Sequence, residues 1–382
     1  MSSKEVYINR TAHFLPNNPV SNDEIETYLG LINGKTSKTK NLILRSNGIV
    51  RRFYALDKNG KTTHTNAQLA SLAIRELFKE NPEELQDIEL LACGTSSPDQ
   101  IMPSHGVMVH GWLPETDAIE VITPSGNCCT GLHAMKYAYL SIKSGEIQKA
   151  VSTGSERTSP LMCASMFSEE AKKLEALIEN PYIAFEKDFL RWMLSDGAGA
   201  FFLTDKKNDK GLSLRIEWME CSSFAHKLKP CMYQGCDKLP DGTLQSYMEY
   251  MPDEIAGKSI LAMKQDVKLL DEHIIELGYQ TLKSIIDKKE IDISSLSWFL
   301  PHISSEFFRK KIAAKLEEKG ISIPREKWFT NLSSVGNIGA GSIYVMVDEL
   351  FKANRLKAGE KILLMVPESS RFSYVYALLT VC

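Results

Sequence analysis

A pair of adjacent cysteines stands where a thiol could be activated for nucleophilic attack. Cys129 lies in the run PSGNCCTGL, which begins at Pro124. An apolar strand pattern at 118–122 precedes this run, and a helical pattern follows from about Thr130 to Ser144. A thiol at a helix N-terminus faces unpaired backbone N–H groups and the positive end of the helix dipole. These groups favour the thiolate at neutral pH, so the sequence predicts Cys129 as a nucleophile.

The chain also contains an internal repeat, seen when the sequence is compared with itself. Residues 90–97 form an apolar strand pattern that runs into a polar loop, and residues 298–305 do the same. This shift of 208 residues (302 minus 94) places Cys129 on Asn337. An amphipathic helix precedes each strand, at 67–79 and at 272–288. We therefore expect two copies of one α/β unit, in an N-terminal half at 1–210 and a C-terminal half at 211–382.

The repeat brings three reactive side chain types to equivalent places. Ligands of α/β sheets bind outside the carboxyl ends of the strands, and Cys129, His302 and Asn337 all follow predicted strand ends. We expect these side chains to converge although they lie far apart in sequence. A thiol, an imidazole and an amide in one pocket are typical of an acyl-transfer site.

The order and spacing of several motifs resemble the thiolase superfamily, and within it the β-ketoacyl-acyl-carrier-protein synthase III group. The similarity covers nearly the whole chain. It is carried by Ser46–Ile49 with Arg51-Arg52, the Cys129 segment, Gly154-Ser155-Glu156, Asp196–Ala200, Pro301-His302 and Gly336-Asn337. The resemblance implies an α/β fold with a duplicated, five-layered α-β-α-β-α architecture, and it implies a homodimer.

The same resemblance implies roles for individual residues. The family pattern of Cys, a small residue, Gly and an apolar residue is matched by Cys129-Thr130-Gly131-Leu132, so it assigns the nucleophile to Cys129 and not to Cys128. It assigns the histidine to His302 and the amide to Asn337. The oxyanion hole would use the backbone N–H of Cys129 and one from the loop 369–372.

The resemblance further implies the reaction and its partners. An acyl group passes to Cys129, and a decarboxylative Claisen condensation with a malonyl-type thioester follows, in fatty-acid or related lipid synthesis. A neutral imidazole and an amide suit the stabilisation of the enolate. The partners would be acyl-coenzyme A or acyl-acyl-carrier-protein thioesters and acyl carrier protein itself. No metal or redox cofactor is required.

Three departures from the family pattern bear on the substrate. Lys40-Asn41-Leu42 replaces a tryptophan typical of enzymes primed by acetyl-coenzyme A. The segment 157–195, with a helical pattern at 168–179, is longer than in the simplest members, and it either reshapes the acyl pocket or is a surface insertion. The turn at 366–372, VPESSRF, is similar to relatives that form dialkylresorcinol or flexirubin-type lipids.

These departures leave alternatives open. A specialised ketosynthase would join two acyl thioesters by condensation and cyclisation, with Glu156 or Glu368 as its base, although such a carboxylate more often has a structural role. A ketosynthase-like acyltransferase would pass the acyl group from Cys129 to oxygen or nitrogen, with His302 as general base. A catalytically idle partner of another ketosynthase is disfavoured, because such chains usually lack the cysteine.

Composition and spacing exclude several other classes. The chain has 382 residues, 43% hydrophobic and 24% charged, with a net charge of -3, which is too balanced to predict nucleic-acid binding. The eight cysteines lack metal-ligand spacing, and Asp196–Ala200 lacks the spacing of a phosphate loop, so we expect close packing there. No signal peptide or membrane span is predicted. The sequence predicts a cytoplasmic enzyme.

Overall fold

One large sheet organises the molecule. The computed structural model describes residues 4–382 except 33, 38 and 168–188. Nine strands form a mixed sheet in the order β13-β14-β15-β8-β1-β7-β6-β4-β5. Their bounds are β1 Tyr7–Phe14, β4 Leu90–Gly94, β5 Glu120–Ile122, β6 Lys149–Glu156, β7 Gly197–Thr204, β8 Leu214–Ser223, β13 Trp298–Pro301, β14 Lys361–Glu368 and β15 Ser373–Val381. The order places the strands of the N-terminal half at one end of the sheet and those of the C-terminal half at the other.

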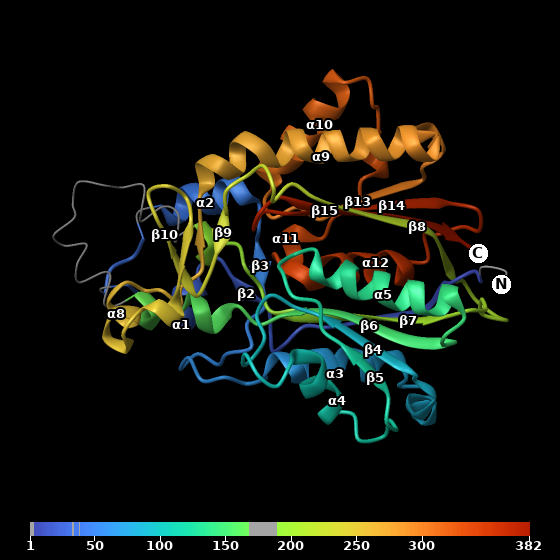
Figure 1. The fold of residues 1–382 in the computed structure, drawn as a ribbon, viewed down its shortest axis with the longest axis horizontal. Coiled ribbons are helices and arrows are strands. Elements are labelled where there is room, and N and C mark those ends of the chain that lie inside the picture. Colours follow the sequence, from blue (N-terminus) through green and yellow to red (C-terminus); the bar gives the residue numbers. More distant parts are fainter. Residues whose placement is uncertain (1–3, 33, 38, 168–188) are drawn as a thin grey trace.

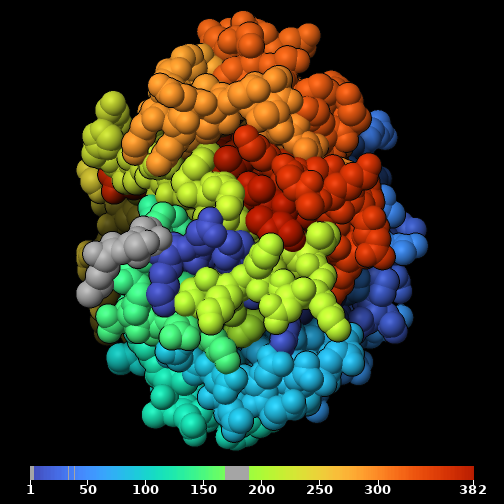
Figure 2. Space-filling model, turned by 90° about the vertical axis from the view of Figure 1, so that its right-hand side faces the viewer, coloured from blue at the N-terminus to red at the C-terminus, as the bar shows by residue number. Residues whose placement is uncertain are grey.

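The sheet folds over two central helices, so that five layers are visible in Figure 1. The central helices are α5 (Thr130–Ser144) and α12 (Ser342–Lys352). The outer layers are α3 (Asn66–Leu77) with α4 (His105–Gly111) on one side and α9 (Val267–Lys289) with α10 (Glu306–Glu318) on the other. This confirms the predicted thiolase-like α/β architecture of layers α-β-α-β-α. Figure 2 shows the outer helices α9 and α10 in orange at one end of the molecule and the N-terminal half in blue to green at the opposite end.

The shorter elements lie around this frame. Short strands pair as β2 with β3, β9 with β12 and β10 with β11. Their bounds are β2 Val20–Ser21, β3 Arg51–Arg52, β9 Met232–Tyr233, β10 Cys236–Lys238, β11 Leu244–Ser246 and β12 Lys264–Gln265. The other α-helices within the described residues are α1 Ile25–Leu29, α2 Lys40–Asn47, α8 Pro252–Gly257 and α11 Leu332–Val335. The predicted helical stretch at 168–179 lies outside the described residues.

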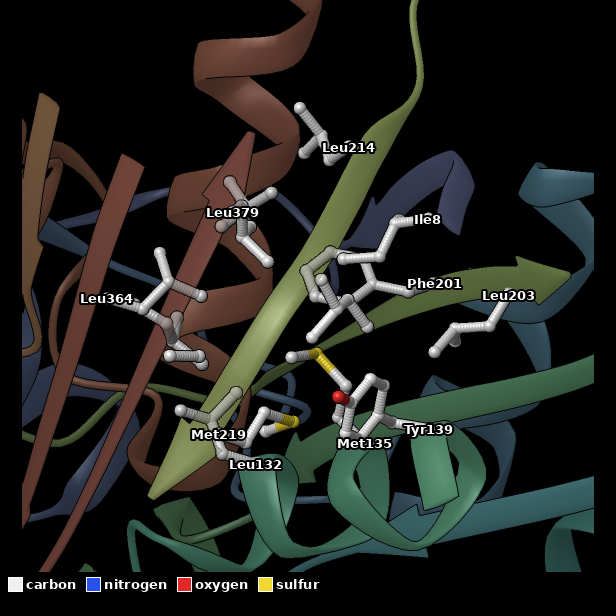
Figure 3. Packing of buried hydrophobic residues seen from close by; sticks show 14 of the residues in the cluster. Ile8, Leu132, Met135, Tyr139, Phe201, Leu203, Leu214, Met219, Leu364 and Leu379 are labelled. Carbon is white, nitrogen blue, oxygen red and sulfur yellow. The ribbon is translucent and has the colours of Figure 1, made fainter. Parts of the chain in front are cut away.

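The helix after the cysteine pair forms where the sequence predicts it. α5 spans Thr130–Ser144, and Gly145 ends it with φ 86°, a left-handed conformation that glycine adopts at little cost. Its apolar side packs between the two sheet layers. Figure 3 shows Leu132, Met135 and Tyr139 of α5 pointing into a cluster that also contains side chains of both halves. The two halves therefore share one hydrophobic core.

The repeat is present as matched elements. α3 precedes β4 in the first half, and α9 precedes β13 in the second. The segment 339–341 forms a short 3-10 turn that opens α12, just as the cysteine segment opens α5. The proposed boundary at 210/211 falls between β7 and β8. Asp196–Ala200 begins β7, and a Cβ on Gly199 would lie 2.2 Å from Cβ of Tyr344. This segment is thus a close-packing site, as predicted.

Candidate active site

A cavity lies where four strands end. The parallel pair β4 and β6 ends at Gly94 and Glu156, the parallel pair β13 and β14 ends at Pro301 and Glu368, and residues at or just after these ends line the cavity. It encloses about 810 Å³ of empty space, including the part open to solvent. Its polar wall consists of Ser96, Asn127, Cys128, Glu156, Thr158, Gln265, His302, Ser304, Asn337 and Ser369. The carboxyl-end position agrees with the place where α/β sheets bind ligands.

The N-terminal ends of the central helices touch beside this cavity. The hydroxyl of Tyr344 in α12 donates a hydrogen bond of 2.7 Å to the carbonyl oxygen of Gly131 in α5. A Cβ on Gly131 would lie 2.4 Å from the carbonyl oxygen of Ala340, closer than any real Cβ contact. Only glycine permits this approach. The contact brings the Asn337 loop to the cysteine pair.

His302 follows β13 directly and is held by the neighbouring strand. Its backbone N–H donates to the carbonyl oxygen of Met365 at 2.7 Å, which extends the β13–β14 pairing by one residue. Its side chain lines the cavity but is 3% exposed. Burial lowers the pKa of His302 to about 4, so its imidazole is neutral at physiological pH. This is the neutral state that the sequence analysis expects.

Asn337 lies in the loop between α11 and α12 and is fixed through its backbone and its side chain. Its Oδ1 accepts the N–H of Gly339 at 2.9 Å, and its own N–H donates to the carbonyl oxygen of Met193 at 3.0 Å. Because Oδ1 already accepts a bond, the amide NH₂ is the group available to a ligand. The structure therefore brings His302 and Asn337 to one cavity from separate loops of the C-terminal half.

The structure places Cys128, and not Cys129, on the cavity wall. Cys129 has no exposed surface and belongs to the shared hydrophobic core. Its Sγ lies 3.3 Å from the carbonyl oxygen of Val366 in β14, to which it donates. Cys128 is partly exposed and lines the cavity with His302 and Asn337. Of the three side chains expected to converge, His302 and Asn337 line the cavity, while Cys129 is buried in the core and its chain neighbour Cys128 lines the cavity.

The expectation of a thiolate at neutral pH is also not met. Burial, and then the nearby carboxylate of Glu368, hold the pKa of the Cys129 thiol well above its ordinary value. Burial likewise raises the pKa of the Cys128 thiol, with further contributions from Glu368 and Glu156. The N-terminal end of α5 favours a thiolate. Its effect is outweighed, because the apolar surroundings and the nearby carboxylates oppose a further negative charge on sulfur. Both cysteines rest as thiols.

Glu368 caps the cysteine segment. Its Oε2 accepts the backbone N–H of Asn127 and of Cys129, each at 3.0 Å, and its Oε1 accepts the hydroxyl of Ser370 at 2.6 Å. The Cys129 N–H that the sequence analysis expects in an oxyanion hole is thus already bound. Ser369 does reach the cavity wall, and its hydroxyl accepts a bond of 3.0 Å from the Gln265 side chain.

Glu156 is a second buried carboxylate on the cavity wall. It accepts the hydroxyl of Ser97 at 2.5 Å, the N–H of Ser96 at 3.1 Å and the N–H of Ala340 at 3.2 Å. Burial raises the pKa of Glu156, and these hydrogen bonds oppose the rise. Its contacts tie β6 to loops of both halves, which is a structural role, while its place on the wall also exposes it to a ligand.

Sequence reasoning missed the apolar wall of the cavity. This wall is built from the start of α9, from α10 and from the segment before β7. It consists of Leu190, Met193, Leu194, Met232, Met263, Leu270, Ile274, Ile275, Ile303, Phe308, Ile312 and Met365. The helical spacing of the α9 and α10 residues was visible in the sequence. Nothing in the sequence showed which side of each helix faces the cavity.

The described residues contain neither a metal-binding cluster nor a membrane-spanning helix. Within 4–382, leaving out the undescribed gaps, no group of three or more His, Cys, Asp or Glu side chains could hold a metal ion. None of the helices in the described part of the chain has both the length and the apolar character that a bilayer-crossing segment needs.

Comparison with known proteins agrees with this geometry. Residues 286–366, which contain His302 and Asn337, match the family 3-oxoacyl-[acyl-carrier-protein (ACP)] synthase III C terminal. The chain is 26% identical over 355 residues to the beta-ketoacyl-[acyl-carrier-protein] synthase III of Clostridium perfringens (strain SM101 / Type A), covering 92% of each protein. The chain is a ketoacyl synthase III-like condensing enzyme of the thiolase superfamily.

Solved structures share the fold of this ketoacyl synthase III-like enzyme over nearly its whole length. AbyA1, a tetronic acid condensing enzyme, superposes with a TM-score of 0.76 at 18% identity, covering 98% of this chain and 99% of that one. OleA of Xanthomonas campestris, solved with bound lauric acid and lauroyl-CoA, gives 0.73 at 19% identity with coverages of 98% and 99%. At these identities the likeness concerns the fold.

Proposed function

We propose that this ketoacyl synthase III-like enzyme carries an acyl group on a cysteine and condenses it with a malonyl-type thioester. The observation that supports this best is the single cavity that Cys128, His302 and Asn337 line together. A thiol, a neutral imidazole and an amide are what acyl transfer followed by carbanion formation requires. The product class is a β-ketoacyl thioester of fatty-acid or related lipid synthesis.

We assign the acyl group to Cys128. Its thiol lines the cavity, whereas the Cys129 thiol points to the Val366 carbonyl within the core. The Cys128 sulfur attacks the carbonyl carbon of the acyl thioester and loses its proton. The thiol of coenzyme A or of the carrier protein leaves with a proton. Because burial lowers the pKa of His302 to about 4, its imidazole is a weak base, so we propose that the Cys128 proton passes to the departing donor thiol and that His302 acts as a neutral hydrogen-bond donor.

The second step forms the carbon–carbon bond. The malonyl-type thioester loses carbon dioxide, and the electron pair released becomes an enolate whose oxygen accepts hydrogen bonds. His302 and the NH₂ of Asn337 are the donors proposed for that oxygen. The enolate carbon attacks the acyl carbonyl, and the bond to the Cys128 sulfur breaks. Cys128 leaves this step as a thiolate, and a proton from solvent converts it back to the thiol.

The apolar wall indicates the donors. It favours acyl thioesters of coenzyme A or acyl carrier protein whose chain is longer than acetyl, because a two-carbon group would leave most of this surface without contact. The binding of lauric acid and lauroyl-CoA by the structurally similar OleA supports the same choice.

A second candidate is the joining of two acyl thioesters without decarboxylation. The observation that favours it is the buried carboxylate of Glu156 on the cavity wall, whose raised pKa suits a base that takes a carbon-bound proton. Measurement of carbon dioxide release during condensation separates the two reactions. Release in step with product supports the first candidate.

We further propose a cytoplasmic homodimer. All eight cysteines are free, which suits a reducing compartment. β5 is an edge strand of the sheet, and the neighbouring segment exposes Ile101, Met102 and Val107. An exposed edge with apolar neighbours is the kind of surface that a second copy can cover.

Intact-protein mass spectrometry with acyl-CoA thioesters tests the proposal. The wild-type enzyme should gain the mass of the acyl group, Cys128→Ser should not, and Cys129→Ser should still gain it. His302→Ala should slow condensation by about a hundredfold or more, the usual contribution of one hydrogen-bond donor to a developing oxyanion. Loss of the adduct in Cys129→Ser with retention in Cys128→Ser would restore the sequence-based assignment.

A further inference from the structure

A lysine and a cysteine from different elements meet at the edge of the shared core. Lys136 lies in the middle of α5, and Cys221 lies near the end of β8. The Nζ atom of Lys136 donates a hydrogen bond of 3.5 Å to Sγ of Cys221, although the two residues are 85 positions apart in the chain. Both residues are partly exposed, and neither lines the active-site cavity. The pair therefore lies outside the site described above.

The packing of α5 against β8 produces this contact. Side chains alternate along a strand, so Met219 and Cys221 point to the same side of β8. Met219 belongs to the shared core cluster, and Figure 3 shows it next to Leu132 of α5. Cys221 packs against the same cluster. Glu220 points to the opposite side, where it pairs with two lysines of α9. The register of β8 on α5 thus holds Cys221 within reach of Lys136.

Lys136 serves no acidic partner. Within the described part of the chain it forms no ion pair with a carboxylate, and its side-chain hydrogen bond goes to Cys221. Burial raises the pKa of the Cys221 thiol, and the charge and the hydrogen bond of Lys136 oppose this rise. Oxidants attack the thiolate, so the lysine favours the reactive form of this thiol. Its amine is also placed to attack the sulfur once that sulfur is oxidised.

We propose that Cys221 is an oxidation site and that Lys136 captures its oxidised sulfur in a covalent S–N bond. In the first step the sulfur attacks hydrogen peroxide, the O–O bond breaks, and the thiol becomes a sulfenic acid with release of one water. In the second step the Lys136 amine, after losing its ammonium proton to solvent, attacks the sulfur. The S–O bond breaks and a second water leaves. The sulfur gives up two electrons, which reduce the peroxide, and the product is a sulfenamide.

The link would protect the sulfur and tie α5 to β8. A sulfenic acid that meets more peroxide becomes a sulfinic acid, which thiols do not reduce. The S–N bond is instead opened by two equivalents of a thiol, which restore the amine and the Cys221 thiol and leave as a disulfide. A bond between residues so far apart in the chain also restricts the unfolded state. The linked enzyme should therefore have a higher Tm than the reduced enzyme. None of this depends on the proposed function.

Peptide mass spectrometry after treatment with hydrogen peroxide tests the proposal. In the wild-type enzyme the peptides that carry Lys136 and Cys221 should be joined, lighter by two hydrogen atoms, and no longer cut by trypsin after Lys136. Dithiothreitol should separate them. Lys136→Arg should abolish the link while keeping the positive charge, because a guanidinium stays protonated. Cys221 should then reach the sulfinic acid. Lys143→Arg is the matched control and should keep the link, since Lys143 lies on the same helix and bonds to Tyr139.

A second variant and the Tm complete the test. Cys221→Ser should restore cleavage after Lys136 in peroxide-treated enzyme, and peroxide should raise the Tm of the wild type and of Lys143→Arg but not that of Cys221→Ser or Lys136→Arg. A wild-type Cys221 that reaches the sulfinic acid as fast as in folded Lys136→Arg would overturn the proposal. A disulfide from Cys221 to another cysteine would do the same. A linked pair that retains an additional oxygen atom would refute the direct S–N bond.

Discussion

At the scale of single residues, Glu368 sets the state of the cysteine pair. Its Oε2 holds the N–H groups of Asn127 and Cys129, which flank the thiol of Cys128. The same carboxylate raises the pKa of Cys128, after burial the largest cause. Glu368 therefore holds the backbone on both sides of Cys128 and raises the pKa of its thiol.

We expect Glu368→Gln to make the Cys128 thiol more reactive. The amide oxygen of glutamine still accepts a backbone N–H, while the negative charge that opposes the thiolate is removed. Iodoacetamide at pH 8 should alkylate Cys128 severalfold faster than in the wild type, measured by peptide mass spectrometry in a Cys129→Ser background. An unchanged rate would mean that burial alone governs this thiol.

The pH dependence of condensation depends on His302. Its pKa is lowered to about 4 by burial, so the imidazole gains a proton only as the pH falls towards 4. An ordinary histidine would lose its neutral form near pH 6.5. We therefore expect single-turnover condensation on preloaded enzyme to keep its rate, as far as His302 is concerned, from pH 7 down to about pH 5. If the condensation rate instead fell on the acid side with a midpoint near pH 6.5, and this fall were absent in His302→Asn, the lowered pKa of His302 would be contradicted.

At the scale of elements, the close approach of α5 and α12 holds the site together. The Gly131 position touches the Ala340 backbone, which belongs to the turn that opens α12. A side chain at Gly131 would push apart the loops that carry Cys128 and Asn337.

Gly131→Ala should consequently destabilise the protein by about 1–3 kcal/mol, the usual cost of overpacking, and remove acylation. The atom that its Cβ would meet is a backbone oxygen 2.4 Å away, which cannot move aside like a side chain end. Thermal denaturation measures the effect. Gly111→Ala is the control, because a Cβ at Gly111 has no neighbour within 4 Å and should leave stability nearly unchanged.

The elements were largely predictable, but the orientation of the cysteine pair was not. Hydrophobic spacing with Gly145 predicted α5, and the five layers followed from the repeat and the family resemblance. The predicted helix at 272–288 begins earlier, at Val267, because Asp266 accepts the N–H of Leu269 and caps it. Which of Cys128 and Cys129 faces the cavity depends on backbone angles around Gly126, whose φ is 151°. No pattern of residue types reports such angles.

At the scale of the whole molecule, the two halves share one core cluster and one cavity. The shared cluster contains Leu132 and Phe201 of the first half and Leu364 and Leu379 of the second. The cavity likewise needs Cys128 from one half and His302 from the other. We expect the two halves to unfold together as one unit.

The proposed dimer belongs to this scale as well. Val107→Asp places a charge on the exposed apolar segment near β5 and should convert a dimer to a monomer, measured by light scattering during size-exclusion chromatography. Val50→Asp is a matched control, since the exposed fractions of Val107 and Val50 are 50% and 55%. A wild-type chain that elutes as a monomer would refute the proposed dimer.

The burial of the cysteine pair beneath β14 has a consequence for the life of the enzyme between turnovers. Peroxide and other oxidants attack thiolates far faster than thiols. Burial, and then the Glu368 carboxylate at the end of β14, raise the pKa of both thiols, and the Val366 carbonyl oxygen also accepts the Cys129 S–H. We therefore expect hydrogen peroxide to oxidise these two thiols of the unliganded enzyme slowly to sulfenic acid, because neither sulfur is held as the reactive thiolate.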